Sequence, residues 1–350
     1  MGIKRVRFNN FRNIAPRELS WSPGLNLLTG ENGAGKTNIL EGLNILSGWG
    51  AFEHGGSISS VPTWESGSSE VQLTGELHSG SVVKVKLARR CFIRLDEKTI
   101  TAADMRRENP VLSFLPADMA IIEGSASCRR RLIDMLLALI IAAYGPRLSE
   151  YRRAVRQKAA LLKKGLSSMP ADRVLLPLSS WIWKMREEGV RLLSEALLQF
   201  TELAPAPLEM RLKRGGAGLA SDFSEDYIAS VTAQKAAEGS LRFPLVGPHR
   251  DDIVITAGKR TASEALSRGL RRRAAIAVML AASEGVRRKT GTEPVLLLDE
   301  VTAELDAEGR RLLFETLFNR KTQVFAASAE PFLEAFPGTV YKIFHGQLVD

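Results

Sequence analysis

The chain has 350 residues, of which 45% are hydrophobic and 25% are charged, and its formal net charge is +9. This composition predicts a soluble globular protein with one large or two moderate domains. No window reaches the roughly eighteen apolar residues of a membrane helix, and the N-terminus lacks the apolar region of a signal peptide. The distant cysteines Cys91 and Cys128 have no metal-ligand spacing around them, so we expect a reduced, cytoplasmic protein.

The positive charge would favour a polyanionic partner, although solvated helix faces explain any single basic cluster equally well. Basic residues crowd three places: 129–131 through 163–164, then 268–273, and finally 287–289.

The N-terminal region contains a phosphate-binding pattern. Residues 2–9 alternate between apolar and charged, which predicts a half-exposed strand. An apolar run, 25–28, then precedes Gly-Glu-Asn-Gly-Ala-Gly-Lys-Thr at 30–37 and a helix with apolar residues at helical spacing. This strand, loop and helix fit a P-loop, and the alternative is an ordinary strand-turn-helix.

Each residue of the loop has a chemical reason to be there. Glycines allow a tight turn whose N–H groups point at an anion, and the helix N-terminus adds its positive dipole. Lys36 would reach the β- and γ-phosphates of a nucleoside triphosphate, and Thr37 would bind Mg²⁺. We therefore expect the loop to bind ATP and Mg²⁺ through Gly30, Asn32, Gly33, Ala34, Gly35, Lys36, Thr37 and Asn38.

The middle of the chain changes character twice. Residues 48–69 are rich in Gly and Ser and predict a loop, and three β-like runs at 71–77, 82–88 and 92–95 predict an antiparallel meander. Long amphipathic helices are then expected at 125–143, 146–165 and 171–203, with a possible fourth at 221–238. These helices form an α-rich insertion large enough to be a lobe.

The C-terminal third supplies the partner of the P-loop. A buried strand, 295–298, ends in Asp299 and Glu300 and is typical of a Walker B segment. Asp299 would hold Mg²⁺, and Glu300 would polarise the attacking water. The alternative is a buried strand that ends in surface acids. A helix at 307–318 and a strand at 323–327 are expected to follow.

A possible signature sequence precedes the long helix predicted at 264–288. Ser267 and Gly269 can offer a hydroxyl and backbone N–H groups to a phosphate, although a simple N-cap is the local explanation. The position of Ala303 to Asp306 is that of the D-loop in dimerising ATPases. A polar turn, Gly247 to Asp252, could be a charged hairpin.

The ordered motifs together resemble the RecF family of bacterial recombination mediators, relatives of the Rad50 and SMC heads. The resemblance spans nearly the whole chain and is carried by Phe11–Asn13, Gly33–Asn38 with Leu40–Glu41, Arg129–Asp134, Leu245–Asp252 and Leu297–Val301. It implies an α/β ABC-type ATPase head, a P-loop core with an additional antiparallel β layer, at 1–117 and 240–350, with an inserted α-helical lobe at 118–239.

The family resemblance also implies a function. Such a chain would clamp DNA as an ATP-dependent homodimer and act with RecO and RecR to place RecA on gapped DNA, in recombinational repair and the SOS response. Lys36 and Glu300 would be catalytic, Thr37 and Asp299 would hold the metal, and Arg12 would approach the phosphates. Ser267 and Gly269 would complete the partner's nucleotide site.

Several positions depart from the family pattern. Leu270 replaces a signature Gln, Ala303 replaces a Ser, no histidine switch follows the strand at 323–327, and no Gln-loop residue is found near 116–118. We therefore expect a weak, DNA-stimulated ATPase. A nucleotide-gated assembly factor with negligible hydrolysis is the main alternative; an ABC transporter subunit would leave the long P-loop to Walker B spacing unexplained.

DNA contacts are expected to be blind to sequence, because nothing resembles a base-reading element. We expect Arg152, Arg153 and Arg156 to contribute before the 129–131 run, which could instead pair with acids near the nucleotide core. Single-stranded, duplex and gapped DNA all remain open as ligands.

Overall fold

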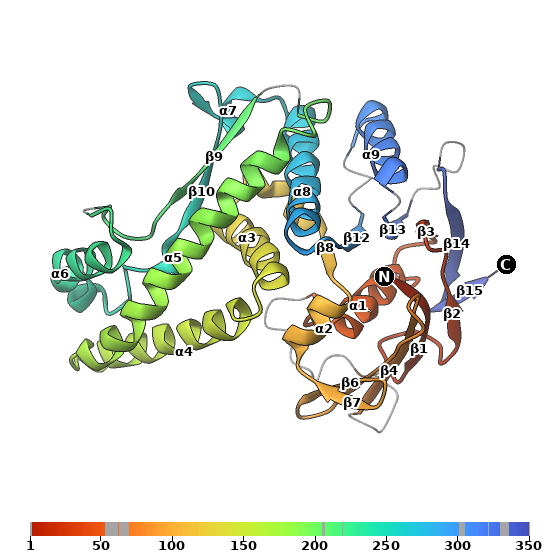
Figure 1. Cartoon of the computed structure of the whole chain (residues 1–350), viewed down its shortest axis with the longest axis horizontal. Coiled ribbons are helices and arrows are strands. Elements are labelled where there is room, and N and C mark those ends of the chain that lie inside the picture. The colour runs from red at the N-terminus through yellow and green to blue at the C-terminus, as the bar shows by residue number, and fades with distance from the viewer. Residues whose placement is uncertain are drawn as a thin grey trace. The chain divides into compact units, whose positions relative to one another are not determined.

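The structure is a computed structural model that describes residues 2–52, 62, 70–204, 207–218, 220–300, 305–320, 322–329 and 336–349 (Figure 1). The chain divides into two compact units. Unit 1 comprises Met1–Met119, Arg272–Met279 and Val286–Asp350, and unit 2 comprises Ala120–Arg271 and Leu280–Gly285. Among the described helices, none combines the length and hydropathy needed to cross a membrane.

The core of unit 1 is a sheet in the order β15-β14-β3-β13-β12-β8. Its bounds are Gln347–Val349 for β15, Thr339–Phe344 for β14, Leu25–Thr29 for β3, Val324–Ser328 for β13, Val295–Asp299 for β12 and Val111–Phe114 for β8. All neighbours are parallel except the edge strand β15. Every residue of β3, β12 and β13 is buried, which explains why apolar residues dominate their sequences.

A second, antiparallel sheet of unit 1 has the order β2-β1-β4-β5-β6-β7. Its bounds are Glu18–Ser20, Ile3–Asn9, Val71–Leu77, Val82–Leu87, Cys91–Leu95 and Lys98–Ile100. The predicted meander is therefore confirmed, and the structure adds the short strand β7. Of the predicted loop at 48–69, residues 53–61 and 63–69 lie outside the described part of the chain.

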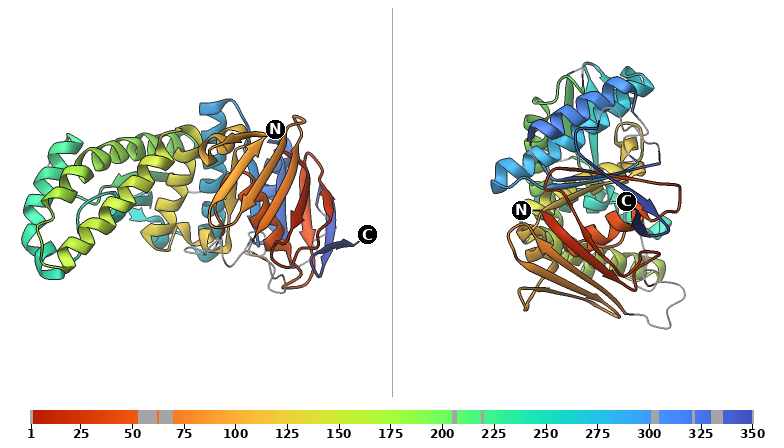
Figure 2. Two further views of the ribbon diagram at one scale, coloured as in Figure 1. Left: turned by 90° about the horizontal axis from the view of Figure 1, so that it is seen from below. Right: turned by 90° about the vertical axis from the view of Figure 1, so that its right-hand side faces the viewer.

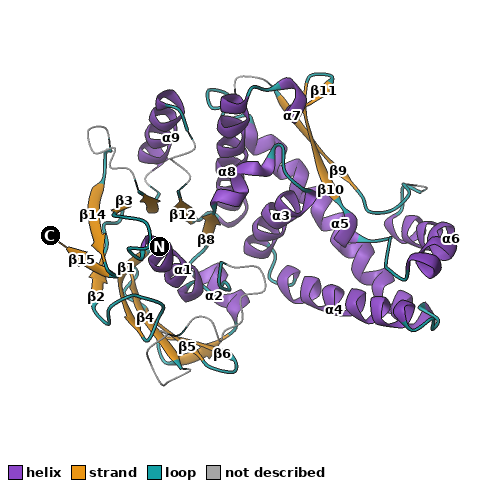
Figure 3. Ribbon diagram, turned by 180° about the vertical axis from the view of Figure 1, so that it is seen from behind, coloured by secondary structure: helices purple, strands orange, loops and turns teal. Residues whose placement is uncertain are grey.

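Helix α1 (Lys36–Leu46) joins the two sheets of unit 1 (Figures 1 and 3). It contacts β12 and β13 of the parallel sheet and β1, β4 and β5 of the antiparallel one. Glycine permits this contact at Gly42, where a Cβ atom would lie 2.2 Å from the Phe8 ring. The antiparallel sheet thus fixes the helix that begins at the P-loop. Helices α2 (Ala102–Glu108) and α9 (Ala307–Arg320) complete this unit.

Unit 2 is mostly helical. It contains α3 (Ala126–Ile140), α4 (Tyr144–Lys163), α5 (Met169–Leu197) and α6 (Phe223–Leu241), and α4 and α5 run side by side (Figure 2). The helices predicted from sequence are confirmed, although α5 ends before residue 203. A three-stranded sheet, β11-β10-β9, is built from Arg260–Thr261, Asp252–Ala257 and Leu208–Lys213.

The return of the chain from unit 2 lies later than the predicted boundary at 239. Strand β10 pairs along its whole length with β9, which keeps the segment up to Arg271 in unit 2. The long helix predicted at 264–288 is divided. A short helix, α7 (Ala262–Ala265), ends at the extended residue Leu266, and α8 (Arg268–Thr290) then contributes residues to both units.

Candidate nucleotide site

The loop between β3 and α1 has the backbone of a phosphate cradle. Gly30, Gly33 and Gly35 have φ values of 151°, 81° and 111°, which favour glycine. At Gly30 a Cβ atom would also lie 2.2 Å from the backbone oxygen of Ile343 in β14. Gly35 is the N-cap of α1 and offers no capping side chain, and the first turn of the helix contains no acidic residue. The helix N-terminus is therefore arranged to receive an anion.

Lys36 lies over this loop. Its Nζ donates hydrogen bonds to the backbone oxygens of Gly30 at 2.8 Å and Glu31 at 3.0 Å, and only 5% of the side chain is exposed. These contacts hold the ammonium group at the mouth of the cradle, where it can meet a phosphate oxygen. The predicted loop residues Asn32 and Asn38 lie on the same segment, and Asn32 is exposed.

The predicted metal residues meet although 262 positions separate them. The Thr37 hydroxyl donates to Asp299 Oδ1 at 2.9 Å and Oδ2 at 3.1 Å. Burial raises the pKa of Asp299, and the neighbouring Glu300 charge adds to this, while Thr37 and Lys36 act in the opposite direction. A hydroxyl beside a buried carboxylate is an oxygen donor set that suits Mg²⁺, and a cation there would offset the cost of burying the charge. The residues present therefore fit the metal.

Glu300 follows β12 in a left-handed conformation, with φ 52°. Its Oε1 lies 4.0 Å from Lys36 Nζ, and its Oε2 accepts a hydrogen bond from the Ala329 N–H at 3.4 Å. The side chain is 30% exposed, so water can reach it. A carboxylate at this position can orient and deprotonate a water beside the phosphate cradle.

The positions where the sequence lacks a switch histidine and a Gln-loop residue, and those of the predicted D-loop, are described only in part. Ser328 is buried at the end of β13, and Glu330 lies outside the described residues. The buried Asp118 accepts a hydrogen bond from the Leu115 N–H at 2.8 Å, so it caps a 3₁₀ turn, Pro116–Ile121. Ala303 and Glu304 of the predicted D-loop also lie outside the described residues. Asp306 accepts from the Gly309 N–H at 2.7 Å and caps α9.

Arg12 contacts the P-loop helix. Its guanidinium forms a bidentate ion pair with the buried Glu41 of α1, at 2.8 Å and 3.0 Å. Next to it, Asn13 donates to the Gly33 oxygen at 3.0 Å and accepts from Asn38 at 2.8 Å. A contact of Arg12 with nucleotide phosphates stays a prediction. The positioning roles of Glu41 and Asn13 were not found from sequence, although both belong to the motifs that carry the family resemblance.

A C-terminal hairpin also supports the P-loop, and nothing in the sequence pattern indicated it. Between β14 and β15, the Gly346 N–H donates to the Ala34 oxygen at 2.8 Å, and the Gly346 oxygen accepts from the Ala15 N–H at 3.0 Å. Gly346 has φ 71°, and a Cβ atom there would lie 1.8 Å from the backbone oxygen of Asn13. The hairpin therefore requires glycine where it meets the cradle.

The predicted signature lies in unit 2 at the start of α8. Ser267 and Gly269 are exposed, and the Ser267 hydroxyl accepts only a long bond, 3.4 Å, from the Leu270 N–H. A Cβ atom at Gly269 would meet nothing within 4 Å. Packing within the described chain therefore gives no reason for glycine at this position.

The turn at Gly247–Asp252 is a structural junction in unit 2. Arg186 of α5, which is almost fully buried, pairs with Asp251 at 2.7 Å and with Asp134 of α3 at 2.9 Å. Trp183 Nε1 donates to Asp251 at 2.8 Å. Burial raises the pKa of Asp251 while Arg186 lowers it. The charged hairpin expected as an alternative is therefore wrong for Asp251, which is buried.

His249 of the same turn is held as a neutral ring. Its Nδ1 lies 2.6 Å from the Tyr151 hydroxyl, and its Nε2 lies 3.2 Å from the Pro244 oxygen. Burial lowers the pKa of His249 to about 4, and the nearby cations contribute. A neutral ring that donates from Nε2 and accepts at Nδ1 satisfies both contacts.

The basic run at 129–131 makes contacts within unit 2, so the expectation that it would pair with acids near the nucleotide core is wrong for Arg129 and Arg130. Arg129 forms a bidentate pair with the Asp252 carboxylate at 2.6 Å and 3.1 Å, and Arg130 donates to the backbone oxygen of Asp251 at 2.6 Å. The predicted DNA contacts Arg152, Arg153 and Arg156 are exposed on α4, and Arg152 also lies 3.4 Å from Asp134. A DNA role for these three residues stays a prediction.

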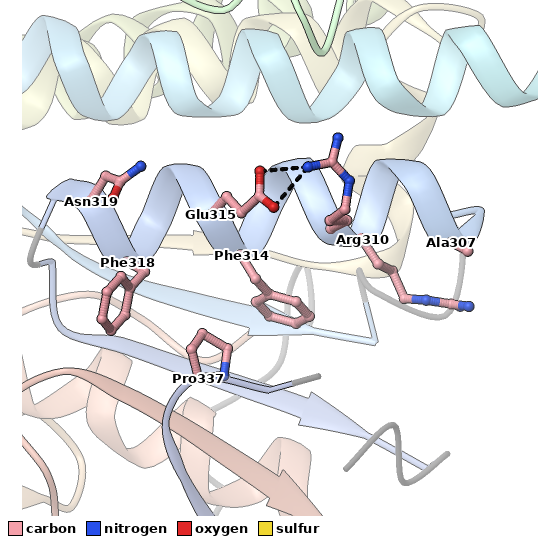
Figure 4. Close-up of a pocket in the computed structure, with 8 residues that line it drawn as sticks. Ala307, Arg310, Phe314, Glu315, Phe318, Asn319 and Pro337 are labelled. Carbon is pink, nitrogen blue, oxygen red and sulfur yellow. Dashed lines mark hydrogen bonds and ion pairs between the residues drawn. The ribbon is translucent and has the colours of Figure 1, made fainter. Parts of the chain in front are cut away.

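A groove of about 490 Å³ lies on α9, and none of the P-loop or Walker B residues lines it (Figure 4). Phe314, Phe318 and Pro337 supply its apolar lining, and Arg310 and Glu315 also line it, with Glu315 paired to Arg311 at 2.7 Å. The lining contains neither a glycine loop nor a hydroxyl–carboxylate pair, so we do not assign the nucleotide to it.

The comparisons with known proteins agree with this geometry. A family model described as an AAA domain matches residues 5–113. The DNA replication and repair protein RecF of Deinococcus radiodurans is 34% identical over 317 residues, which cover 87% of this chain and 84% of that protein. A solved structure of the recombination mediator protein RecF with ATP, in the RecFOR pathway, has a TM-score of 0.85 at 24% identity and covers 99% of this chain and 97% of that one.

An SMC head bound to the C-winged helix domain of ScpA has a TM-score of 0.58 at 15% identity, over 100% of this chain and 97% of that one. The P-loop sheet, the antiparallel layer packed on α1 and the helical unit inserted between P-loop and Walker B define an ABC-type ATPase head. The predicted fold class is confirmed. The relatedness to RecF extends over most of the chain, and the chain belongs to the RecF family.

Proposed function

We propose that this protein is an ATP-hydrolysing DNA clamp that dimerises on ATP and supports recombinational repair. The observation that carries the proposal is the contact of Thr37 with Asp299, because it places the P-loop and the Walker B carboxylate at one site. The names of the relatives, which describe DNA replication and repair and the RecFOR pathway, support the same conclusion.

In the proposed reaction, the N–H groups of the loop and Lys36 bind the phosphates of ATP. Thr37 and Asp299 would hold Mg²⁺, which supplies positive charge to the phosphates when bound. Glu300 takes a proton from the attacking water, and its contact with the Ala329 N–H keeps the carboxylate turned toward Lys36. The sequence has no histidine at 328–330, directly at the end of β13, so Glu300 acts with little help and turnover is slow.

Dimerisation would complete the site. Ser267 and Gly269 are exposed, and Gly269 has open space around it, as expected if a second chain's phosphate approaches this helix N-terminus. The γ-phosphate would make a contact that ADP lacks, which is the differential contact needed to shift an equilibrium toward the dimer. Hydrolysis would then open the clamp.

The same proposal includes DNA as a ligand, a RecR partner acting with RecO, and indirect action on RecA. It also includes a role in the SOS response and a cytoplasmic location. Sequence-blind phosphate contacts fit the exposed arginines of α4. The test is fluorescence anisotropy with single-stranded, duplex and gapped DNA, each with ATP and with ADP. Binding to none of the three DNAs in either nucleotide state would refute the clamp.

A second candidate, a nucleotide-gated assembly factor with negligible hydrolysis, is favoured by Ser328, which occupies the position expected of a switch histidine. ATP turnover measured with and without DNA separates the two. Turnover that rises with DNA supports the ATPase clamp, and turnover indistinguishable from that of a Glu300→Gln variant supports the assembly factor.

A further inference from the structure

One segment of unit 2 lies along helix α4 and is bound to it at two places. At the C-terminal end of the helix, the Arg242 guanidinium donates to the Lys163 backbone oxygen at 3.0 Å. Closer to the middle of the helix, the Tyr151 hydroxyl lies 2.6 Å from His249 Nδ1. Lys163 ends α4 while Tyr151 lies in its first half, so the segment 242–250 follows the helix in the opposite direction.

The middle of this arrangement is fixed by a buried charge. Lys158 of α4 is fully buried and pairs with Glu238 at 2.6 Å and Asp172 at 2.9 Å. Glu238 also accepts a hydrogen bond from the Leu245 N–H at 2.7 Å, which ties the segment to α4 between its two ends. Removing one member of such a buried set is costly, so the segment is held rigidly against the helix.

The two aligned elements carry positive charge and no negative charge. Neither 151–164 nor 242–250 contains an aspartate or a glutamate. We call their exposed basic residues the α4 basic surface; it consists of Arg152, Arg153, Arg156, Lys163, Lys164, Arg242 and Arg250. Arg152 also lies 3.4 Å from Asp134. A row of exposed cations on a rigid scaffold suits a polyanion.

Arg250 is the outward-facing charge of the family motif. His249 contacts Tyr151 and Pro244, Asp251 pairs with Arg186, and Asp252 pairs with Arg129. Arg250 is exposed and forms no ion pair with the described residues. Its guanidinium carbon lies 5.8 Å from the centroid of the Phe243 ring.

Phe243 is 45% exposed, so its ring is open to solvent beside the guanidinium of Arg250. The Arg250 guanidinium lies over this ring, and Arg242 precedes it in the chain. An aromatic face beside cations is the arrangement that stacks a nucleic-acid base while the backbone is neutralised.

We propose that the α4 basic surface, with Phe243, binds single-stranded DNA: the cations contact phosphates and Phe243 stacks on an unpaired base. This inference rests on the proposed DNA-binding function and adds the place and the form of DNA. A paired base keeps its faces stacked within the duplex, so a stacking ring contributes only where a strand is unpaired. Cations alone would suffice for a surface that binds duplex backbone.

The test compares Phe243→Leu, which keeps apolar volume but removes the ring, with Phe243→Tyr, which keeps the ring. Anisotropy is measured on the full chain with ATP, using oligo(dT) and a duplex of equal length. Because a base–aromatic stack contributes about 1–3 kcal/mol, Phe243→Leu should weaken oligo(dT) binding roughly 5- to 150-fold and leave duplex binding nearly unchanged. Phe243→Tyr should bind as the wild type does.

Arg250→Gln tests the charge. It should weaken binding and lower the slope of log affinity against log salt by about 0.7 for a lost single-strand phosphate contact. Arg260→Gln in the same unit is the matched control, because Arg260 is also exposed but lies on β11, away from α4.

A photo-cross-link between iodouracil-substituted oligo(dT) and Phe243, located by mass spectrometry, is the direct readout of the proposed contact.

Two failures can be distinguished. If the wild type binds no DNA, the proposed function itself is wrong. If the wild type binds oligo(dT) and both Phe243→Leu and Arg250→Gln bind it equally well, the clamp stands and the assignment of this surface is overturned. Equal weakening on oligo(dT) and duplex in Phe243→Leu would also overturn it, because stacking on an unpaired base could not be the cause.

Discussion

Replacing Glu300 with Gln should stop ATP turnover while preserving or strengthening ATP binding. The substitution keeps the shape of the side chain and its hydrogen bond from the Ala329 N–H, but it removes the base and the negative charge. Loss of a general base costs about 10²- to 10⁴-fold in rate. Turnover by the variant should therefore fall by at least two orders of magnitude.

The direction of the binding change follows from the geometry around Lys36. At 4.0 Å from Lys36 Nζ, the Glu300 carboxylate attracts the ammonium group by about 4 kcal/mol at an effective dielectric constant near 20. Because Glu300 is 30% exposed, solvent screening reduces this to about 1 kcal/mol. Removing the carboxylate leaves Lys36 available to a phosphate and removes a repulsive charge beside it, so ATP should bind up to about fivefold more tightly.

The assay has two parts, with Lys36→Ala as the contrasting variant. Binding of a fluorescent ATP analogue measures affinity, and phosphate release under single-turnover conditions measures chemistry. Lys36→Ala should lose ATP binding, because it removes the ammonium group held between the oxygens of Gly30 and Glu31. Equal loss of nucleotide affinity in both variants would refute the assignment of Glu300, and wild-type turnover in Glu300→Gln would refute its role as the base.

Three further predictions follow from other parts of the molecule. Ser267→Arg should leave ATP binding nearly intact but prevent the ATP-driven association that light scattering measures. The control variant, Thr99→Arg on the exposed strand β7, should dimerise normally. A Ser267→Arg protein that still dimerises would show that this signature does not lie in the interface. Arg186→Met should lower the free energy of unfolding, measured in urea, by about 3–5 kcal/mol, because Asp134 and Asp251 lose a buried partner. Arg191 is 75% exposed, so the control variant Arg191→Met should change this free energy by under about 1 kcal/mol. Equal effects of the two substitutions would contradict the buried network. The pKa of His249 is about 4 in the folded chain and near 6.5 in the unfolded chain, so the unfolded chain binds the proton first as the pH falls. The free energy of unfolding should therefore fall by about 3 kcal/mol between pH 6.5 and pH 4. His249→Gln should show a shallower decline, and an identical decline would count against the neutral ring.

The sequence by itself determined the local chemistry of this protein. The P-loop could be recognised because its glycines, Lys36 and Thr37 lie within one strand, turn and helix, whose conformations depend on neighbouring residues. The Walker B strand could be recognised because a strand covered on both faces must be a continuous apolar run. Family membership followed from the order of such short motifs.

Tertiary structure alone decided which distant residues meet. The pair Thr37 and Asp299 depends on the order of strands in the parallel sheet, and the support of the P-loop by Gly346 depends on β14 lying beside β3. Periodicity in a sequence reports which face of an element is buried, but not what covers that face. For the same reason the motif at Gly247–Asp252 could be found but not interpreted. Only the fold shows that its acids and His249 contact partners within unit 2, whereas Arg250 lies beside Phe243 on the surface.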